Sequence, residues 1–489
     1  MERSELPHAS ASRIAQAIRS RENSAGEVLE AYLERIDRVN PKVNAIVTLD
    51  VEGSRRRAAE ADRALGQGTL WGPLHGVPIT IKDTFETAGL RTTSSFEPLR
   101  DYVPEGDATS VARLRAAGAV ILGKTNMPKL AGDVQSNSPL FGPARNPWDL
   151  SRTPGGSTGG GAAAVAAGLS ALDLGSDIGG SIRVPAHFCG VYGLKPTEHL
   201  VPGTGHIPDL PGATKGVHHM NTYGPLARSV EDLELALRLL AGPDGRESRV
   251  PPVPLRETKS RALESMRFAW VDAFGDLRAD QSTRETVARL VEMLARRGCV
   301  VREQVPQDFD IELAWRAYGM ILGTESAAWL PWQQRLKVAF FYQFAHRDDP
   351  MSQTIGKAHT LRLRPYMRAL AQRERLIAAL EAFFGEWDVF LCPVCATPAF
   401  QHRPTPGLLP GEPIRVDGRS YPYWVAYTGF TAIFNLTGNP VVVIPIGISP
   451  EGLPIGVQLV GPRWGDLELL SIARQVAAVL GGIPRPPEL

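Results

Sequence analysis

The sequence predicts an α/β fold in which helices cover both faces of a central sheet. Short apolar runs rich in β-branched residues alternate with helical stretches along most of the 489 residues, which is typical of this class. Hydrophobic residues make up 43% and charged residues 21% of the chain, proportions that indicate a globular protein. No run of about 18 apolar residues occurs, so we expect no membrane-spanning helix and no membrane partner.

The first 65 residues are predicted to be helical. Ser24 and Glu27 form a capping box at the start of the second helix, and Asn40-Pro41 should end that helix. The helices expected in this part of the chain cover 8–21, 24–39 and 51–65.

Strands and helices alternate through the next part of the chain, up to residue 241. We expect strands near 77–82, 119–122 and 171–174, and helices over 108–117, 161–169 and 229–241. Residues 197–224 are rich in proline and glycine and are predicted to form a loop rather than a helix or strand. Long loops are often functional, and in this one His206 and Asp209 either contact a substrate or cap turns.

The alternation resumes after a polar, proline-rich connection at 242–263, which should be exposed. We predict strands over 267–271, 299–303, 387–392, 441–447 and 455–460, and helices over 283–297, 424–436 and 465–480. A proline-rich loop at 393–422 should border the mouth of a site, and a helical region at 311–384 has a break near 346–354. The aromatic residues of that region stand at helical spacing, which usually indicates core packing; they are Trp315, Tyr318, Trp329, Trp332, Phe340, Phe341, Tyr342 and Phe344.

Residues 154–196 hold two glycine clusters, each with one serine inside it. In the second cluster, which runs from Asp177 to Ser181, successive backbone N–H groups can converge on an anion. An acyl-transfer enzyme needs such a group beside its nucleophile, because the tetrahedral intermediate carries an oxyanion. Ser181 is therefore our candidate nucleophile.

A serine nucleophile needs a base, and Lys82 is the candidate. It ends the apolar run G-V-P-I-T-I-K-D at 76–83, so it is expected to be buried, and burial can leave an amine neutral near physiological pH. Ser157 in the first glycine cluster could relay a proton between Lys82 and Ser181. The helix that follows Ser157 adds a positive dipole end, which should help to keep the amine neutral.

At these residues the chain resembles the amidase signature family. The matching segments are G-V-P-I-T-I-K-D at 76–83, G-K-T-N-M-P at 123–128, N-P-W-D-L-S-R-T-P-G-G-S at 146–157, D-I-G-G-S-I-R-V-P-A at 177–186, N-L-T-G-N-P at 435–440 and G-L-P-I-G-V-Q-L-V-G-P at 452–462. The resemblance runs from about Ser24 to about Leu480. It implies the amidase signature fold, with a mixed central sheet covered by helices, and amide hydrolysis through an acyl-enzyme.

Carried over position by position, the resemblance makes Ser181 the nucleophile, Ser157 the cis-serine and Lys82 the base of a Ser–cisSer–Lys triad. It places the oxyanion donors on the backbone of Ile178, Gly179, Gly180 and Ser181. It also implies a single domain over 1–489, made of an N-terminal helical layer at 1–65, a catalytic core at 66–241, the exposed connection at 242–263, and a variable helical region with the C-terminal part of the sheet at 264–489. In the family the variable region helps to build the acyl or leaving-group pocket, so the alternative to core packing is that some of its aromatic side chains face the substrate.

Three further residues are expected to support the site. Asp177 and Arg183 flank the nucleophile and should brace its loop by ion pairing and hydrogen bonding. Thr158 stands where the family usually has a second serine. Its hydroxyl is retained, but the β-branch restricts its side-chain torsion.

Other chemistries fit the sequence less well. Residues 155–159 match G-x-S-x-G, but prolines precede them where a nucleophile elbow needs a strand. His187 lies nearest to Ser181 in sequence and is interpreted as structural. Cys392 and Cys395 form C-x-x-C without a second cysteine or histidine pair, so they are interpreted as buried thiols, and no metal or cofactor is expected.

The surroundings of the protein can also be predicted. A net charge of +1 gives no sign of nucleic-acid binding, and the N-terminal segment lacks the features of a signal peptide. A reducing cytoplasm is the expected compartment. The oligomeric state is left open, a homodimer included.

Three functions compete for this sequence. The first is a stand-alone amidase for a hydrophobic or aryl amide, with aryl esters and carbamates as further substrate classes. The second is the glutaminase subunit of a tRNA-dependent amidotransferase, which usually carries a segment of the type L-G-T-Y-x-L-S-x-G-Y; residues 320–329 read M-I-L-G-T-E-S-A-A-W instead. The third is a non-enzymatic scaffold, which the presence of Lys82, Ser157 and Ser181 disfavours.

Overall fold

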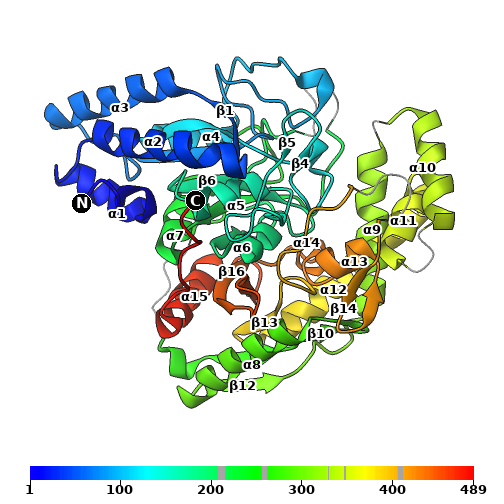
Figure 1. Cartoon of the computed structure of the whole chain (residues 1–489). Coiled ribbons are helices and arrows are strands. Elements are labelled where there is room, and N and C mark those ends of the chain that lie inside the picture. The colour runs from blue at the N-terminus through cyan, green and yellow to red at the C-terminus, as the bar shows by residue number, and fades with distance from the viewer. Residues whose placement is uncertain (208–214, 256–260, 329, 346–348, 406–410) are drawn as a thin grey trace.

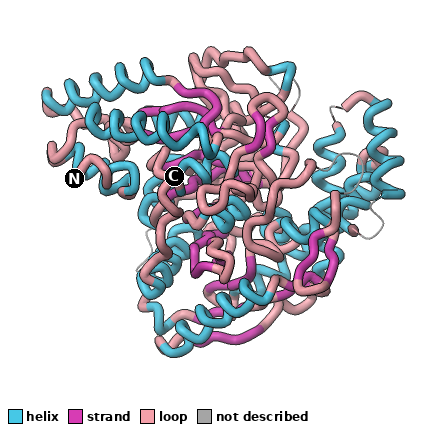
Figure 2. The backbone as a smooth tube through the Cα atoms, viewed as in Figure 1, coloured by secondary structure: helices cyan, strands magenta, loops and turns pink. Residues whose placement is uncertain are grey.

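In the described part of the chain, eleven strands form one mixed sheet that runs through the molecule (Figures 1 and 2). The computed structural model describes residues 1–489 except 208–214, 256–260, 329, 346–348 and 406–410. In spatial order the strands are β1 (Ile46–Leu49), β3 (Val120–Thr125), β2 (Pro78–Lys82), β6 (Leu172–Asp177), β8 (Thr222–Ala227), β7 (Tyr192–Lys195), β16 (Val441–Ile448), β17 (Pro454–Val460), β13 (Val389–Pro393), β9 (Arg267–Trp270) and β12 (Val300–Glu303).

Parallel and antiparallel pairs both occur in this sheet. The strands run parallel along β3-β2-β6 and along β13-β9-β12, and the remaining neighbours are antiparallel. Strands from both halves of the chain therefore share one sheet, and the predicted α/β class is confirmed. The prediction that 1–489 form one domain in four parts stays a prediction, which this shared sheet favours.

Helices pack against both faces of the sheet. The helices next to the site are α5 (Gly159–Ala166), which packs on β2 and β6, and α6 (Arg183–Cys189), which packs on β16 and β17. The others that contact strands include α2 (Ala25–Val43), α3 (Val51–Gly66), α7 (Val230–Leu240), α8 (Gln281–Arg296) and α15 (Asp466–Leu480), while α4 (Thr109–Ala116) packs on α7.

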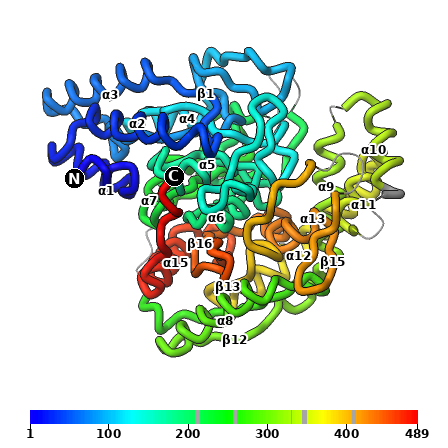
Figure 3. The backbone as a smooth tube through the Cα atoms, viewed as in Figure 1, coloured from blue at the N-terminus to red at the C-terminus, as the bar shows by residue number. Residues whose placement is uncertain are grey.

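The two ends of the chain meet at the N-terminal helices (Figure 3). Helix α1 (Ala11–Arg19) packs on α7, and α2 packs on β2. Glu488 near the C-terminus forms ion pairs with Arg35 and Arg38 of α2. Of the residues described for these N-terminal helices, none lines the cavity that holds Ser157 and Ser181, which favours a structural role for them.

The helical region at 311–384 forms a lobe on one side of the molecule (Figure 1). It consists of α9 (Ile311–Ala327), α10 (Trp332–Ala345), α11 (Pro350–Ala358) and α12 (Leu363–Phe384). Trp315 and Tyr318 are buried, but Trp332, Phe340 and Phe341 are exposed, so the core interpretation was wrong for these three. Trp329 and the side chain of Phe344 lie outside the described residues.

Several predicted boundaries were wrong. Helix α2 continues past Pro41 to Val43, because a proline in the last turn removes only one hydrogen bond of the helix. The predicted loop at 197–224 includes the start of β8, and the loop at 393–422 contains a hairpin of β14 (Ile414–Val416) and β15 (Arg419–Tyr421). The helix predicted at 424–436 is two helices, α13 (Tyr423–Thr428) and α14 (Ala432–Leu436).

Four elements beside the site or at the sheet edge were not predicted: β1, α6, β7 and β8. Three short pairs complete the described strands: β4 (Asn137–Ser138) with β5 (Gly142–Pro143), β10 (Ala273–Phe274) with β11 (Leu277–Arg278), and the hairpin above. In the ranges that the structure covers, no helix is long and apolar enough to cross a membrane.

Candidate active site

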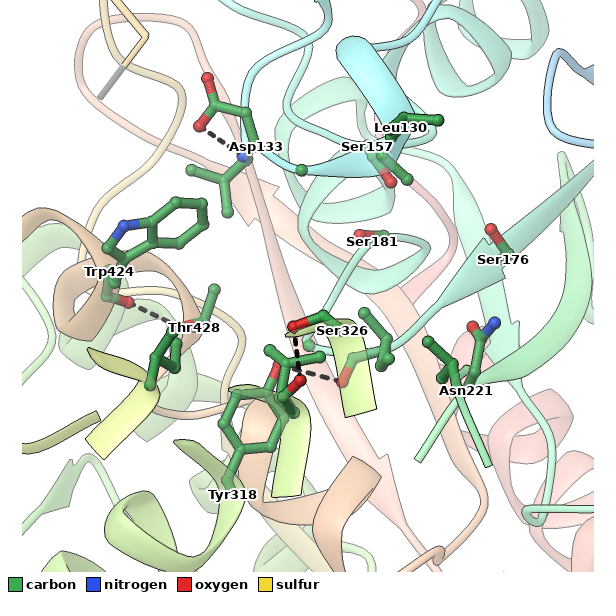
Figure 4. Close-up of a pocket in the computed structure, with 18 of the residues that line it drawn as sticks. Leu130, Asp133, Ser157, Ser176, Ser181, Asn221, Tyr318, Ser326, Trp424 and Thr428 are labelled. Atoms are coloured by element: carbon green, nitrogen blue, oxygen red, sulfur yellow. Dashed lines mark hydrogen bonds between the residues drawn. The ribbon is translucent and has the colours of Figure 1, made fainter. Parts of the chain in front are cut away.

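A cavity of about 280 Å³ lies where both glycine clusters meet the helical lobe (Figure 4). Ser157 and Ser181 both line it, together with Ser176 and Asn221. Side chains of α9, α10, α11 and α13 give it an apolar wall, formed by Leu322, Tyr342, Met351, Ile355 and Trp424. The cavity thus combines the two predicted serines with a largely apolar surface.

Lys82 is the last residue of β2 and is completely buried. Its Nζ lies 2.7 Å from Ser157 Oγ and 3.0 Å from Thr158 Oγ1. Ser176 supplies two more contacts, from Oγ at 3.1 Å and from its carbonyl at 3.4 Å. The amine is therefore surrounded by neutral oxygens rather than paired with a carboxylate.

The protonation of Lys82 follows from this environment. Burial lowers the pKa of its amine to about 7, against the effects of Asp177 and Asp173, which raise it. The next residue, Asp83, forms its ion pair with a different lysine: its carboxylate lies 3.8 Å from Nζ of the buried Lys124. The predicted burial of Lys82 is confirmed, and a pKa of about 7 leaves part of the amine neutral near that pH.

Ser157 stands at the start of α5, after a cis peptide bond between Gly156 and Ser157. Helix α5 can approach the strands closely because its first turn carries only glycine. A Cβ on Gly160 would lie 2.4 Å from the backbone of Asn126, and one on Gly161 would lie 2.0 Å from Asp173 Oδ2. The missing side chains allow this helix to bring Ser157 and Thr158 to Lys82.

Ser181 lies in the turn between β6 and α6 and faces the same cavity as Ser157 (Figure 4). No hydrogen bond joins the hydroxyl groups of these two described serines. Catalytic hydrogen bonds are often long in the absence of substrate and shorten in the reactive complex.

The turn that carries Ser181 is held by Asp177 and Arg183, both completely buried. Arg183 donates to Asp177 from Nη2 at 2.9 Å and from Nε at 3.1 Å. Although burial alone would raise the pKa of Asp177, the charge and hydrogen bonds of Arg183 hold it below the usual range. The predicted bracing pair is therefore present.

This pair is fixed to the rest of the fold by residues that the sequence did not predict. Arg183 Nη1 donates to the carbonyl of Thr431 at 2.9 Å and to Gln458 Oε1 at 2.8 Å. Asn435 Nδ2 donates to Asp177 Oδ1 at 2.9 Å. Asn435 belongs to the N-L-T-G-N-P motif, so its position in a matched segment was the only available signal.

The backbone around Ser181 offers three open N–H donors. In the described structure, the N–H groups of Ile178, Gly179 and Ser181 have no hydrogen-bond acceptor. Gly180 differs from the prediction, because its N–H donates to Asp177 Oδ1 at 2.8 Å. The Ile178 carbonyl accepts from Tyr318 Oη at 3.2 Å, which turns the following N–H, that of Gly179, to the opposite side.

Thr158 contacts two sides of the site. Its hydroxyl donates to the carbonyl of Ser176 at 3.3 Å and accepts from Lys82. Its γ-methyl group packs over Gly175, where a Cβ would lie 2.7 Å from that methyl. The substitution of threonine for the usual serine therefore retains the contact with Lys82 and is accommodated by a glycine.

The remaining predicted residues fall in different places. His206 lines the cavity, whereas Asp209 lies outside the described residues. His187 is structural: it is buried, and its Nδ1 accepts from the backbone N–H of Gly456 at 2.7 Å. All four cysteines are buried and free. Among the residues that the structure covers, no group of three or more His, Cys, Asp or Glu side chains could hold a metal ion.

Comparisons with known proteins place these features in context. A family model described as Amidase matches residues 27–470. The chain is similar to an acylamidase of Rhodococcus erythropolis, with 33% identity over 479 residues that cover 96% of this chain and 95% of the relative. It is also similar to a glutamyl-tRNA(Gln) amidotransferase subunit of Carboxydothermus hydrogenoformans, with 32% identity over 96% of both chains. The crystal structure of an amidase superimposes with a TM-score of 0.78 at 30% identity, covering 97% of this chain and 100% of that chain.

Proposed function

We propose a stand-alone amidase activity for this chain, which belongs to the amidase signature family and is therefore a hydrolase of amide C–N bonds. The substrate class is a carboxylic amide with a hydrophobic or aryl group, and aryl esters and carbamates are further substrates of the same site. The observation that carries the proposal is the completely buried Lys82 amine, 2.7 Å from Ser157 Oγ, beside Ser181 in a cavity with an apolar wall.

The first half of the reaction acylates Ser181. Neutral Lys82 accepts the proton of Ser157, which in turn accepts the proton of Ser181 as its Oγ attacks the amide carbonyl. The backbone N–H groups of Ile178, Gly179 and Ser181 stabilise the oxyanion, whereas the Gly180 N–H donates to Asp177 and helps to hold the turn. The proton returns through Ser157 to the leaving nitrogen, and the C–N bond breaks.

The second half releases the acid. A water molecule loses a proton to Lys82 through Ser157 and attacks the acyl carbonyl. The bond between the carbonyl carbon and Ser181 Oγ then breaks, and Ser181 regains its proton. Throughout the cycle Arg183 and Asp177 hold the turn in place, so they position the nucleophile without reacting.

The apolar wall supports the choice of a hydrophobic or aryl group. Leu322, Met351 and Ile355 are aliphatic or thioether side chains, and Tyr342 and Trp424 add aromatic surface. A small polar amide such as glutamine would leave this surface in contact with water, whereas an aryl group would cover it.

A glutaminase role is the competing function, because the chain is also 32% identical to the amidotransferase subunit of Carboxydothermus hydrogenoformans. One panel separates the two. The purified chain and its Ser181→Ala variant are given glutamine, a short aliphatic amide, aryl amides and an aryl carbamate, and release of amine or ammonia is measured.

Hydrolysis of aryl substrates by the wild type and not by Ser181→Ala is the expected result. Hydrolysis of glutamine alone, or activity only after partner chains are added, would favour the amidotransferase role. No turnover of any substrate, with no labelling of Ser181 by a serine-reactive probe, would contradict both.

A further inference from the structure

His206 is a buried polar group of the cavity that the mechanism above does not use. Its side chain is only 5% exposed, and in the described structure its Nε2 has no hydrogen-bond partner. The ring packs edge-on against Phe85 with centroids 4.8 Å apart, and it packs at a tilt against Tyr223 with centroids 4.9 Å apart. Two aromatic neighbours thus fix the ring while leaving that nitrogen unsatisfied.

The neighbours of His206 in the cavity form one polar wall, which we define as Ser176, His206 and Asn221. Ser176 of β6 pairs with Tyr223 of β8, so their side chains project from the same face of the sheet. Asn221 lies two residues before Tyr223 and donates to its hydroxyl at 3.2 Å, which places it on that face too. Figure 4 shows Ser176 and Asn221 on one side of Ser181, and Trp424 and Thr428 on the other.

The polar wall lies on the side of the proton relay. Ser176 Oγ is 3.1 Å from Lys82 Nζ, and Lys82 is 2.7 Å from Ser157 Oγ. The charge of Lys82 is also among the causes, after burial, that lower the pKa of His206 well below its usual value. Its ring is therefore neutral, with one nitrogen able to accept a hydrogen bond and the other able to donate one.

The position of the relay decides which half of a substrate meets this wall. The leaving nitrogen must receive its proton from Ser157, so it lies on the side of Lys82 and Ser176. The apolar wall of α9, α10, α11 and α13 remains for the other half. The hydrophobic group of the substrate is then its acyl group, and its nitrogen meets hydrogen-bonding side chains.

From this arrangement we propose that His206 and Asn221 bind the unsubstituted nitrogen of a primary amide. The inference rests on the proposed amidase function and narrows its substrates to primary amides of hydrophobic or aryl-substituted acids, which release ammonia. His206 and Asn221 accept hydrogen bonds from the two N–H groups, and they hold the nitrogen where Ser157 can protonate it. An anilide would put an aromatic ring against this polar wall instead.

The test compares three derivatives of one acid, phenylacetic acid: its primary amide, its methyl ester and its anilide. His206→Phe keeps an aromatic ring between Phe85 and Tyr223 but removes both nitrogens. We expect kcat/KM for the primary amide to fall at least about tenfold, the loss of one hydrogen bond to the reacting group. The value for the ester, which has no N–H group, should change less than about threefold.

Asn221→Ala gives a second, independent measurement and should change the ratio of amide to ester activity in the same direction. Leu322→Ala is the contrasting variant: it removes apolar surface from the opposite wall, so it should lower amide and ester activities together and leave their ratio unchanged. Retained ester hydrolysis shows that His206→Phe and Asn221→Ala are folded, and residual hydrolysis of both substrates shows the same for Leu322→Ala.

Equal losses for amide and ester in His206→Phe would overturn the proposal, as would wild-type kcat/KM values for the anilide that match or exceed those for the primary amide. Both outcomes would leave the proposed amidase function standing. If the wild type hydrolyses none of the three derivatives, that result would instead contradict the proposed function itself.

Discussion

The pH dependence of hydrolysis tests the role of Lys82 directly. Burial lowers the pKa of its amine to about 7 from the usual 10.5. At pH 7 about half of the molecules would then hold a neutral base, whereas an ordinary lysine would be neutral in only about one molecule in three thousand. Below pH 7 the fraction of neutral base falls tenfold per pH unit, so kcat/KM should be about ten times lower at pH 6 than at pH 8.

A second buried group titrates in the same range and must be distinguished. Burial raises the pKa of Asp173 to about 7, and its carboxyl accepts from Thr80 at 2.7 Å. Asp173 and Asp177 both raise the pKa of Lys82, and Lys124 acts on Asp173 from β3. Asp173→Asn removes one of these negative charges, so the protonated form of Lys82 becomes less favourable and the pKa of Lys82 falls.

The assay is kcat/KM for one amide from pH 5 to pH 9.5 at constant ionic strength, for the wild type and Asp173→Asn. We expect one rising limb centred near pH 7 in the wild type, displaced to lower pH in the variant. Centring of the wild-type limb above pH 9 would show that Lys82 is not the neutral base described here. Disappearance of the limb in Asp173→Asn would assign the titration to Asp173 instead.

Four further variants, at three positions, probe the packing of the site. Thr158→Ser keeps the contact with Lys82 and should cost about 1 kcal/mol of folding free energy, measured by chemical denaturation, with little change in kcat. Thr158→Val loses the hydroxyl and should lower kcat in steady-state kinetics. Arg183→Met leaves Asp177 buried without its partner and should lower the free energy of unfolding by about 3–5 kcal/mol, read from urea titrations. Lys82→Met should lower kcat by about a thousandfold or more. It should also raise the melting temperature at pH 7. Burial lowers the pKa of Lys82 in the folded state, so the unfolded state binds more protons between pH 7 and 10.5, and this cost to folding is absent in the variant. A lower melting temperature for Lys82→Met would contradict that account of burial.

The sequence predicted the central part of the site because its motifs carry local information. A lysine at the end of an apolar strand is by itself more often an ordinary surface lysine, and only the whole set of matched motifs assigned Lys82 its role. The Lys82–Ser157 contact, the braced turn of Asp177 and Arg183, and the cavity position of Ser181 all follow from those patterns. Ser176 was missed because it stands inside a strand, where a serine usually has no special meaning.

Elements that break local rules could not be predicted. Strand β8 contains Gly224 and Pro225 in its middle, although both residues are unfavourable there. A Cβ on Gly224 would lie 2.1 Å from the carbonyl oxygen of Leu194, so close packing of β7 requires the glycine. Helix α6 contains Pro185, which is tolerated in the first turn because its missing N–H would have no partner within the helix.

The helical lobe shows a different limit of sequence reasoning. Trp332, Leu336 and Phe340 of α10 follow helical spacing, yet they are 60%, 54% and 61% exposed. Periodicity reports that a helix has an apolar face, and it does not report whether another part of the chain covers that face. In contrast, Tyr342 on the same helix lines the cavity. Helical spacing in the sequence therefore does not distinguish the aromatic residues that line the cavity from those that are exposed to solvent.

The glycines of α5 connect these observations, since they explain how a lysine can be buried without an ion pair. A helix with ordinary side chains would stand away from β2 and β6, and water or a counter-ion would reach Lys82. With Gly160 and Gly161 against the backbone of Asn126 and the carboxyl of Asp173, the helix closes over the amine and supplies hydroxyl groups in place of charges. The low pKa of Lys82 and the position of Ser157 are therefore two consequences of one close contact between a helix and a sheet.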